Sequence, residues 1–223
     1  ADKTGEFVVT NEDFTGVKDA DGNLTGWTKE DPNPGSYDSY YIPEMKQAGW
    51  KGTQYAPYTD YICLDGWQYY HNHQDAGLIS PEMDMSKDGG KFTVNVKLAG
   101  ASTIAIDENN NEFTAYTQAA FALFNYNETT CDYEQAELIY PQGYPKAVNG
   151  DWKNFTINFT KGSKKSIIGI YAVYADEHLY LDDLKITQKY QAGESLNDPF
   201  IFRRWLQEPK VDITIPAFVG KSD

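Results

Sequence analysis

The sequence predicts an all-β protein, an antiparallel β-sandwich of the jelly-roll type. Eight short strand-like runs recur along the chain, and segments rich in Gly, Asn and Asp separate them. Helical periodicity is nearly absent. At 223 residues the chain is long enough to bury roughly 70% of its unfolded surface, so a substantial core is expected between two sheets.

The strand-like runs are short and apolar, and turn-forming sequences such as "KDGGK" and "KGSKK" lie between them. One run shows the reason for the assignment clearly. Phe155, Ile157 and Phe159 share one parity, while Asn154, Thr156 and Asn158 hold the other, as in a half-buried strand. The expected strands are 6–10, 91–100, 102–106, 119–126, 136–140, 152–160, 165–174 and 179–187.

Charge divides the chain near residue 190. From Lys189 onward there are five basic and five acidic residues, so residues 1–188 hold 14 of the 19 basic and 28 of the 33 acidic ones. All of the net charge of -14 therefore lies before that point. We expect a jelly-roll domain over 1–190 and a C-terminal tail, edge strand or linker over 191–223.

Composition excludes two classes of partner and leaves the redox state open. A net charge of -14 repels nucleic acid and anionic lipid. No apolar run approaches the ~20 residues that span a bilayer, so no membrane insertion is expected. A targeting signal is absent or already removed. Cys63 and Cys131 are the two cysteines, and both a disulfide and two separate thiols remain open.

Residues 27–75 hold eleven aromatic residues, and all of them are Tyr or Trp. A core accepts Phe freely, whereas rings that meet both water and a partner favour a polar tip. The segment therefore predicts a recognition surface for a glycan or polysaccharide; the alternative is a long insertion held together by its own packing. The residues expected to contact ligand are Trp50, Tyr55, Trp67, Tyr69 and Tyr70.

Few residues suggest catalysis or transition-metal binding. His71, His73 and Asp75 share one face if the segment is extended, which is compatible with zinc, although solvent-facing histidines are the simpler interpretation. His178 is expected at the surface, at a strand entry. The segment 107–112 has the composition of a polar turn, and no nucleophile, P-loop or dinucleotide motif occurs.

Three motifs occur in a characteristic order: "NEDFTG" at 11–16, "AGLISPEMDMS" at 76–86 and "LYLDDLKIT" at 179–187. In this order the chain resembles the choice-of-anchor J or cleaved-adhesin domains, relatives in shape of MAM domains, over about residues 6–188. The resemblance implies a concanavalin or galactose-binding-like β-sandwich. It also implies a secreted or cell-surface location in bacteria and a role in binding or adhesion.

The resemblance also suggests why a strand contains two adjacent carboxylates. In such sandwiches the closing strand lies beside the N-terminal segment, so the carboxylates of both would meet at one edge. Converging carboxylates suit a structural Ca²⁺ ion. The alternative is that one Asp accepts backbone N–H bonds and the other faces solvent. The candidate calcium ligands are Glu12, Asp13, Asp182 and Asp183.

We therefore expect a non-catalytic, extracellular carbohydrate-binding or adhesion module that contacts ligand through its Tyr- and Trp-rich surface. Two alternatives remain: a structural or protein-adhesion spacer that contacts other surface proteins, and a glycoside hydrolase-like enzyme, which needs a spaced pair of carboxylates.

Overall fold

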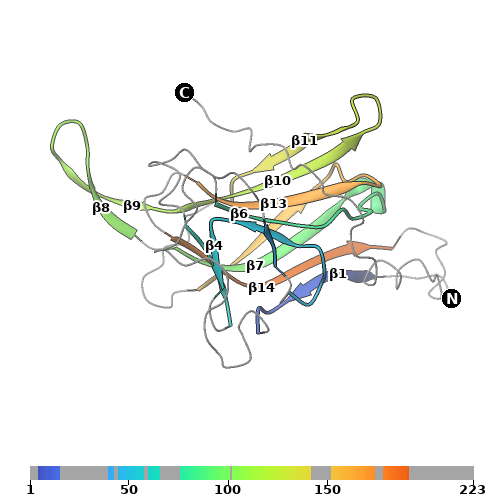
Figure 1. Cartoon of the computed structure of the whole chain (residues 1–223), viewed down its shortest axis with the longest axis horizontal. Coiled ribbons are helices and arrows are strands. Elements are labelled where there is room, and N and C mark those ends of the chain that lie inside the picture. Colours follow the sequence, from blue (N-terminus) through green and yellow to red (C-terminus); the bar gives the residue numbers. More distant parts are fainter. Residues whose placement is uncertain are drawn as a thin grey trace.

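Two six-stranded antiparallel sheets face each other and confirm the predicted β-sandwich (Figure 1). Sheet A has the order β12-β7-β14-β5-β4, with β1 also paired to β14, and sheet B has the order β11-β10-β13-β6-β3-β2. The computed structural model describes residues 5–15, 40–42, 45–57, 60–65, 76–100, 102–141, 152–173 and 178–190.

The strands of sheet A are β1 (Glu6–Glu12), β4 (Tyr55–Pro57), β5 (Ile62–Asp65), β7 (Phe92–Gly100), β12 (Lys153–Phe159) and β14 (His178–Lys189). The strands of sheet B are β2 (Tyr40–Tyr41), β3 (Lys51–Thr53), β6 (Ala76–Ile79), β10 (Gln118–Asn127), β11 (Asp132–Ile139) and β13 (Ser166–Val173). A short 3-10 turn, η1 (Asp88–Gly90), precedes β7.

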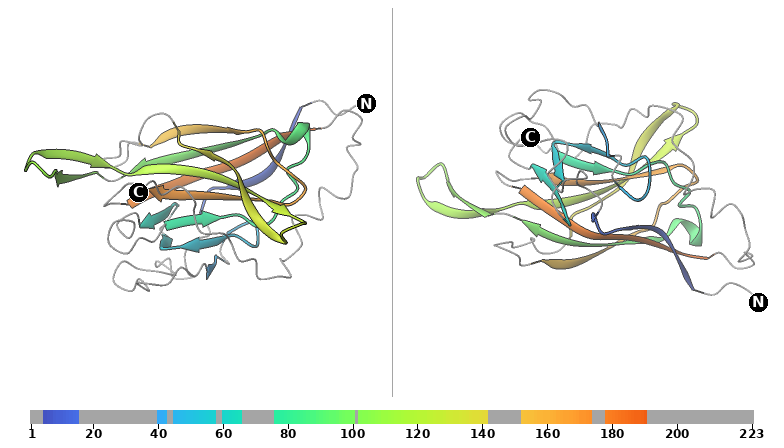
Figure 2. Two further views of the ribbon diagram at one scale, coloured as in Figure 1. Left: turned by 90° about the horizontal axis from the view of Figure 1, so that it is seen from above. Right: turned by 60° about the horizontal axis from the view of Figure 1, so that its bottom comes forward.

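The chain order gives the sandwich its jelly-roll character. From β5 to β7 and again from β11 to β14, successive strands belong to alternate sheets, so the chain crosses repeatedly from one layer to the other. Figure 2 shows the two layers with β14 and β7 side by side in one of them. The predicted strands of the second half of the chain match β10, β12, β13 and β14 closely, whereas the strand expected at 136–140 covers only the second half of β11.

Alternating residues build the main core between the sheets. On β12, Phe155, Ile157 and Phe159 are buried while the residues between them are exposed, as the period-two pattern predicts. Strand β7 follows the same rule, with its even-numbered residues Phe92 to Leu98 in the core. The odd-numbered residues of β7 therefore lie on the outer face of sheet A, turned away from the core.

The centre of sheet B, around β10 and β13, is buried on both faces. In β10, Phe121 and Leu123 belong to the main core, whereas Ala122 and Phe124 belong to a second apolar cluster on the opposite face. All eight residues of β13 are buried. Tyr171 lies so close over its neighbours that a Cβ added at Gly169 would be 2.4 Å from its ring. The outer face of sheet A along β7 and β12 is more open than this part of sheet B.

A two-stranded hairpin of β8 (Ser102–Ile106) and β9 (Glu112–Tyr116) projects from the sandwich (Figure 1). Its turn confirms the polar turn expected over 107–112. The Asp107 carboxylate accepts hydrogen bonds from the backbone N–H groups of Asn109 and Asn111, both at 2.8 Å. These bonds, with one from the Asn111 side chain, lower the pKa of Asp107 and fix the turn.

Several features went beyond the sequence predictions. The short strands β2 to β6 were not predicted, because two- to four-residue strands carry too little periodicity to detect. Cys63 is buried and Cys131 exposed, and neither forms a disulfide. Within the residues described, no helix is long and apolar enough to cross a membrane. The expected tail over 191–223 lies outside the described residues.

Candidate functional site

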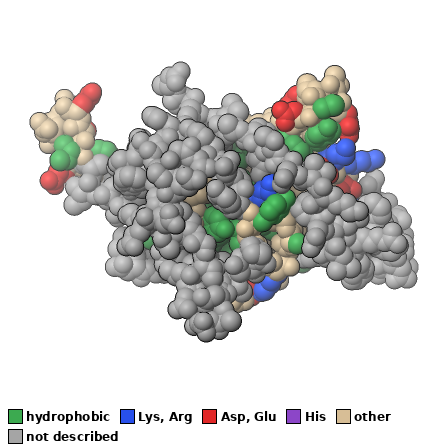
Figure 3. All heavy atoms as spheres, viewed as in Figure 1, with side chains coloured by type: hydrophobic (Ala, Val, Ile, Leu, Met, Phe, Trp, Pro, Cys, Tyr) green, Lys and Arg blue, Asp and Glu red, His purple; other side chains and the backbone are tan. Residues whose placement is uncertain are grey.

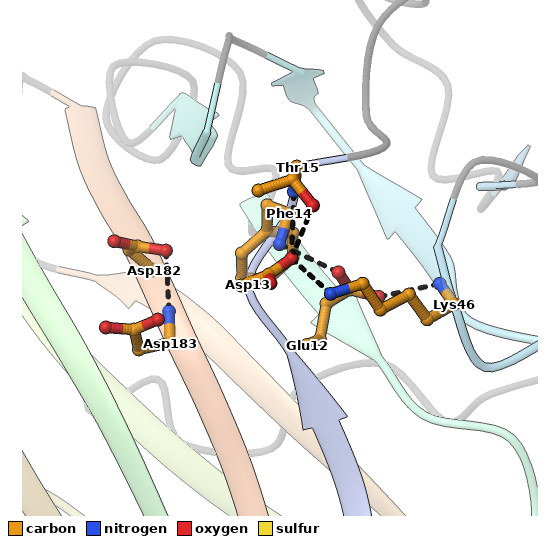
Figure 4. A network of polar contacts seen from close by, with 7 residues as sticks. All are labelled: Glu12, Asp13, Phe14, Thr15, Lys46, Asp182 and Asp183. Atoms are coloured by element: carbon orange, nitrogen blue, oxygen red, sulfur yellow. Dashed lines mark hydrogen bonds and ion pairs between the residues drawn. The ribbon is translucent and has the colours of Figure 1, made fainter.

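The two N-terminal carboxylates of the expected calcium site bind protein donors (Figure 4). Glu12 is buried, and its two oxygens accept the backbone N–H groups of Phe14 and Lys46, each at 2.7 Å. Asp13 forms an ion pair with the Lys46 ammonium at 2.5 Å and accepts two bonds from Thr15. The Lys46 contact and the Thr15 bonds lower the pKa of Asp13 to about 2.

The double aspartate of β14 lies at a β-bulge. Against β7 the register slips between Asp182 and Lys185, so β14 holds one extra residue there. Asp183 accommodates the extra residue, because its backbone, with a φ of +48°, adopts the left-handed conformation. The Asp182 carboxylate accepts the Asp183 N–H at 2.7 Å, and Asp183 forms an ion pair with Lys97. Burial raises the pKa of Asp182.

The bulge also marks a change of neighbour along the other edge of β14. Residues 178–181 pair with β5, and residues 184–189 pair with β1. Asp182 and Asp183 fill the two positions between these ladders, where no regular strand partner is available to them on that edge among the residues described. Short polar side chains that bind their own backbone suit such a break.

These contacts favour the second interpretation of the double aspartate. One Asp accepts a backbone N–H bond, and the other is exposed and paired with a lysine. In the ranges that the structure describes, no group of three or more His, Cys, Asp or Glu side chains is placed to hold a metal ion. The expected convergence of Glu12, Asp13, Asp182 and Asp183 on one cation is therefore not seen.

The structure corrects the assignment of two predicted ligand residues. Trp50 is 0% exposed, and its indole N–H donates to the Gln47 amide oxygen at 3.0 Å. The same oxygen accepts the Thr10 hydroxyl at 2.7 Å, which ties the segment before β3 to β1. Tyr55 is 7% exposed and packs in the same core. Neither ring lies on the surface, because both fill the space between the sheets.

Other predicted residues cannot be placed. Trp67, Tyr69, Tyr70, His71, His73 and Asp75 lie outside the described residues. His178 lies at the start of β14, which confirms the strand entry, but it is half-buried and not fully at the surface as expected.

A cluster of aromatic side chains lies instead on the outer face of sheet A. Tyr180 of β14 alternates with the core residues Leu179 and Leu181, which places its ring on the outer face. The Tyr61 ring packs edge-to-face against Tyr180 at 5.7 Å and against Trp152 at 5.6 Å between centroids. All three rings are half-buried. We call Tyr61, Trp152 and Tyr180 the aromatic cluster.

Small buried residues form the floor of this cluster. Tyr180 is paired with Ala99 on one side and with Cys63 on the other, and these two are 3% and 1% exposed. Small residues beside a ring let it lie close to the sheet, and the neighbouring rings keep it there. Burial raises the pKa of Tyr61, so its hydroxyl stays protonated and can donate or accept a hydrogen bond at neutral pH.

A ladder of uncharged polar pairs continues from the aromatic cluster along β7 and β12. Thr93 donates to the Asn158 amide oxygen at 2.9 Å, and Thr156 donates to the Asn95 amide oxygen at 2.8 Å. Each pair is directly opposite in the register of the two strands. We call these four residues the polar ladder. Rings with polar tips beside neutral hydroxyl and amide groups can bind a ligand that has both apolar faces and hydroxyl groups.

Of these residues, Tyr61 belongs to the Tyr- and Trp-rich segment 27–75, and Thr156 and Asn158 were predicted on the polar side of a strand. None of them, nor Trp152 or Tyr180, was among the residues expected to contact ligand. A signal for Tyr180 was present, since His178, Tyr180 and Asp182 share one parity against Leu179 and Leu181. No such signal joined Tyr61 to Trp152, because 90 residues separate them and only sheet pairing brings them together.

Comparisons with known proteins give distant likenesses only. No family model and no curated protein matches the chain. Among solved structures, the xylan-binding domain CBM22-1 of Paenibacillus barcinonensis Xyn10C is 8% identical, with a TM-score of 0.44 over 86% of this chain and 99% of that one. The K3 cleaved adhesin domain of Lys-gingipain from Porphyromonas gingivalis is 15% identical, with a TM-score of 0.39 over 81% and 98%.

A third solved structure, TmCBM61 in complex with β-1,4-galactotriose, is 13% identical, with a TM-score of 0.32 over 69% of this chain and 94% of that one. All three TM-scores are below 0.5, so a function for this chain has to be argued from its own side chains. The resemblance to choice-of-anchor J domains stays a prediction.

Proposed function

We propose that the protein is a non-catalytic carbohydrate-binding domain whose ligand face is the outer face of sheet A. The observation that supports this is the aromatic cluster: three half-buried rings, locked edge-to-face, above a floor of small residues. Tyr and Trp rings offer flat apolar faces to the carbon-bound hydrogens of a sugar ring, while their polar tips meet its hydroxyl groups.

The surroundings support a sugar over a purely apolar ligand. Further along the same strands lie the hydroxyl and amide groups of the polar ladder, which can exchange hydrogen bonds with sugar hydroxyls. Because the rings are already held by their neighbours, little side-chain entropy remains to be lost on binding. The three sequence motifs resemble those of choice-of-anchor J domains, which supports an extracytoplasmic location on bacteria. We include this location in the proposal.

Affinity electrophoresis in gels that contain a soluble polysaccharide tests the proposal. Xylan, β-1,4-galactan and β-1,3-glucan are suitable neutral probes. We expect at least one to retard the chain, and Trp152→Ala or Tyr180→Ala to abolish the retardation. Tyr41→Ala is the matched control: Tyr41 is 42% exposed but belongs to sheet B, under the Lys51 ammonium, so its loss leaves retardation unchanged.

Two results would contradict the proposal. Retardation that survives both Trp152→Ala and Tyr180→Ala means that the aromatic cluster is not the ligand face. Release of reducing sugar from a retarding polysaccharide means that the domain is a hydrolase and not a binder, because binding alone breaks no glycosidic bond.

The projecting hairpin favours a second candidate, a protein-adhesion module. Ile106 is 65% and Phe113 50% exposed near its tip, and Figure 3 shows apolar and acidic side chains together on this projection. Exposed apolar side chains on a fixed projection are typical of protein contacts. This candidate predicts no retardation by any polysaccharide, together with adhesion to bacterial cells that Phe113→Ser abolishes.

A further inference from the structure

The polar ladder has hydrogen-bonding groups that the protein itself leaves unused. In both pairs a threonine hydroxyl donates to an asparagine amide oxygen. The amide nitrogens of Asn95 and Asn158 have two N–H donors each, and no partner for them is found among the residues described. Thr156 and Asn158 are exposed. The ladder therefore offers fixed donors, with their acceptor ends already held by the sheet.

The ladder and the aromatic cluster lie along the same two strands, with one outward-facing pair, Asn154 and Lys97, between them. Lys153 of β12 pairs with Leu98, so Trp152 comes next to Ala99, which in turn pairs with Tyr180. From Trp152 to Asn158 the chain advances six residues, or roughly 20 Å at the rise of a β-strand. A single sugar ring covers only part of this distance, whereas a chain of several rings along β12 and β7 can cover all of it.

The charges of this face balance. Lys97 is paired with Asp183. By parity, β14 also places Asp182, Lys185 and Lys189 on the outer face, and Glu6 of β1 pairs with Lys189 there. Three positive and three negative charges give no net attraction for an anion. The net charge of -14 of the whole chain further disfavours polyanions.

We infer that the ligand is a neutral glycan chain bound lengthwise along β12 and β7, with one part stacked on the aromatic cluster and the rest hydrogen-bonded to Asn95 and Asn158. This inference rests on the proposed function and specifies its ligand. The site is an open strip on a sheet face, so it binds the interior of a chain and not only its end.

Titration calorimetry with oligosaccharides tests the inference. The probes are the monosaccharide, trisaccharide and hexasaccharide of whichever neutral polysaccharide retards the chain, with polygalacturonate as the anionic probe. We expect affinity to rise from trisaccharide to hexasaccharide. The double variant Asn95→Ala/Asn158→Ala removes two hydrogen bonds, which corresponds to about tenfold to hundredfold weaker hexasaccharide binding with the trisaccharide unaffected. Asn109→Ala, an exposed asparagine in the hairpin turn, is the matched control.

The outcomes separate the inference from the proposed function. Lengthwise binding is overturned if the trisaccharide and the hexasaccharide bind with equal affinity. It is also overturned if the double variant binds both oligosaccharides as the wild type does. In either case the aromatic cluster still stands as the ligand face. Polygalacturonate that binds as tightly as the neutral chains overturns the neutral ligand class. If Trp152→Ala leaves the binding of every probe unchanged, the proposed function itself is overturned.

Discussion

Replacing Trp50 by alanine is expected to destabilise the domain strongly. The side chain is 0% exposed and is the largest fully buried one among the described residues. Removing a buried aromatic ring costs about 3–5 kcal/mol, because apolar contacts are lost and a cavity remains. The indole donor to Gln47 is lost as well. For a chain of this size the expected fall in melting temperature is roughly 6–20 °C.

Urea unfolding monitored by circular dichroism measures this cost, with two companion variants as controls. Trp50→Phe keeps most of the ring but loses the indole donor, and is expected to cost about 1–3 kcal/mol. Trp152→Ala removes a half-buried surface ring and is expected to cost about 1 kcal/mol. A Trp50→Ala variant with the stability of the wild type would refute the placement of Trp50 in the core.

Further predictions concern the carboxylates and the thiols. Because the pKa of Asp13 is lowered to about 2 from 3.8, its contribution is fully present above pH 3.8 and lost as the pH falls through 2. In urea unfolding, the free energies of unfolding of wild type and Asp13→Asn should therefore converge at low pH. At neutral pH they should differ by less than about 1 kcal/mol, since both partners are exposed. If the two values do not converge at any pH, the ion pair is contradicted. Chelator should leave the melting temperature unchanged; a lower melting temperature would support the calcium site expected from the sequence. A thiol reagent should titrate Cys131 in the native protein and Cys63 only after unfolding, whereas no reaction in either state indicates a disulfide.

The sequence predicted the fold better than it predicted the site, for a physical reason. Alternation along a strand is local. Strand β12, and the placement of Tyr180 and Asp182 on the same face of β14, could therefore be recognised without knowing which strands lie beside them. The fold class follows from many such strands together. A bulge depends on the register of two strands, so the conformation of Asp183 and its pairing with Lys97 had no local signal.

Composition misled the interpretation of Trp50 and Tyr55. Absence of Phe from 27–75 suggested exposed rings, but an indole can be buried when an acceptor is available, and Gln47 supplies it. The buried second face of sheet B was equally hidden, because the continuous apolar run of β13 does not show what covers each side.

Oxidative footprinting of the aromatic side chains, with and without a retarding neutral polysaccharide, tests the central claim most directly. If the outer face of sheet A binds glycan, ligand protects Tyr61, Trp152 and Tyr180 from labelling, and Tyr41 on sheet B is labelled equally in both states. Protection of Tyr41 with no change at the aromatic cluster would contradict the account and place the ligand on the other sheet.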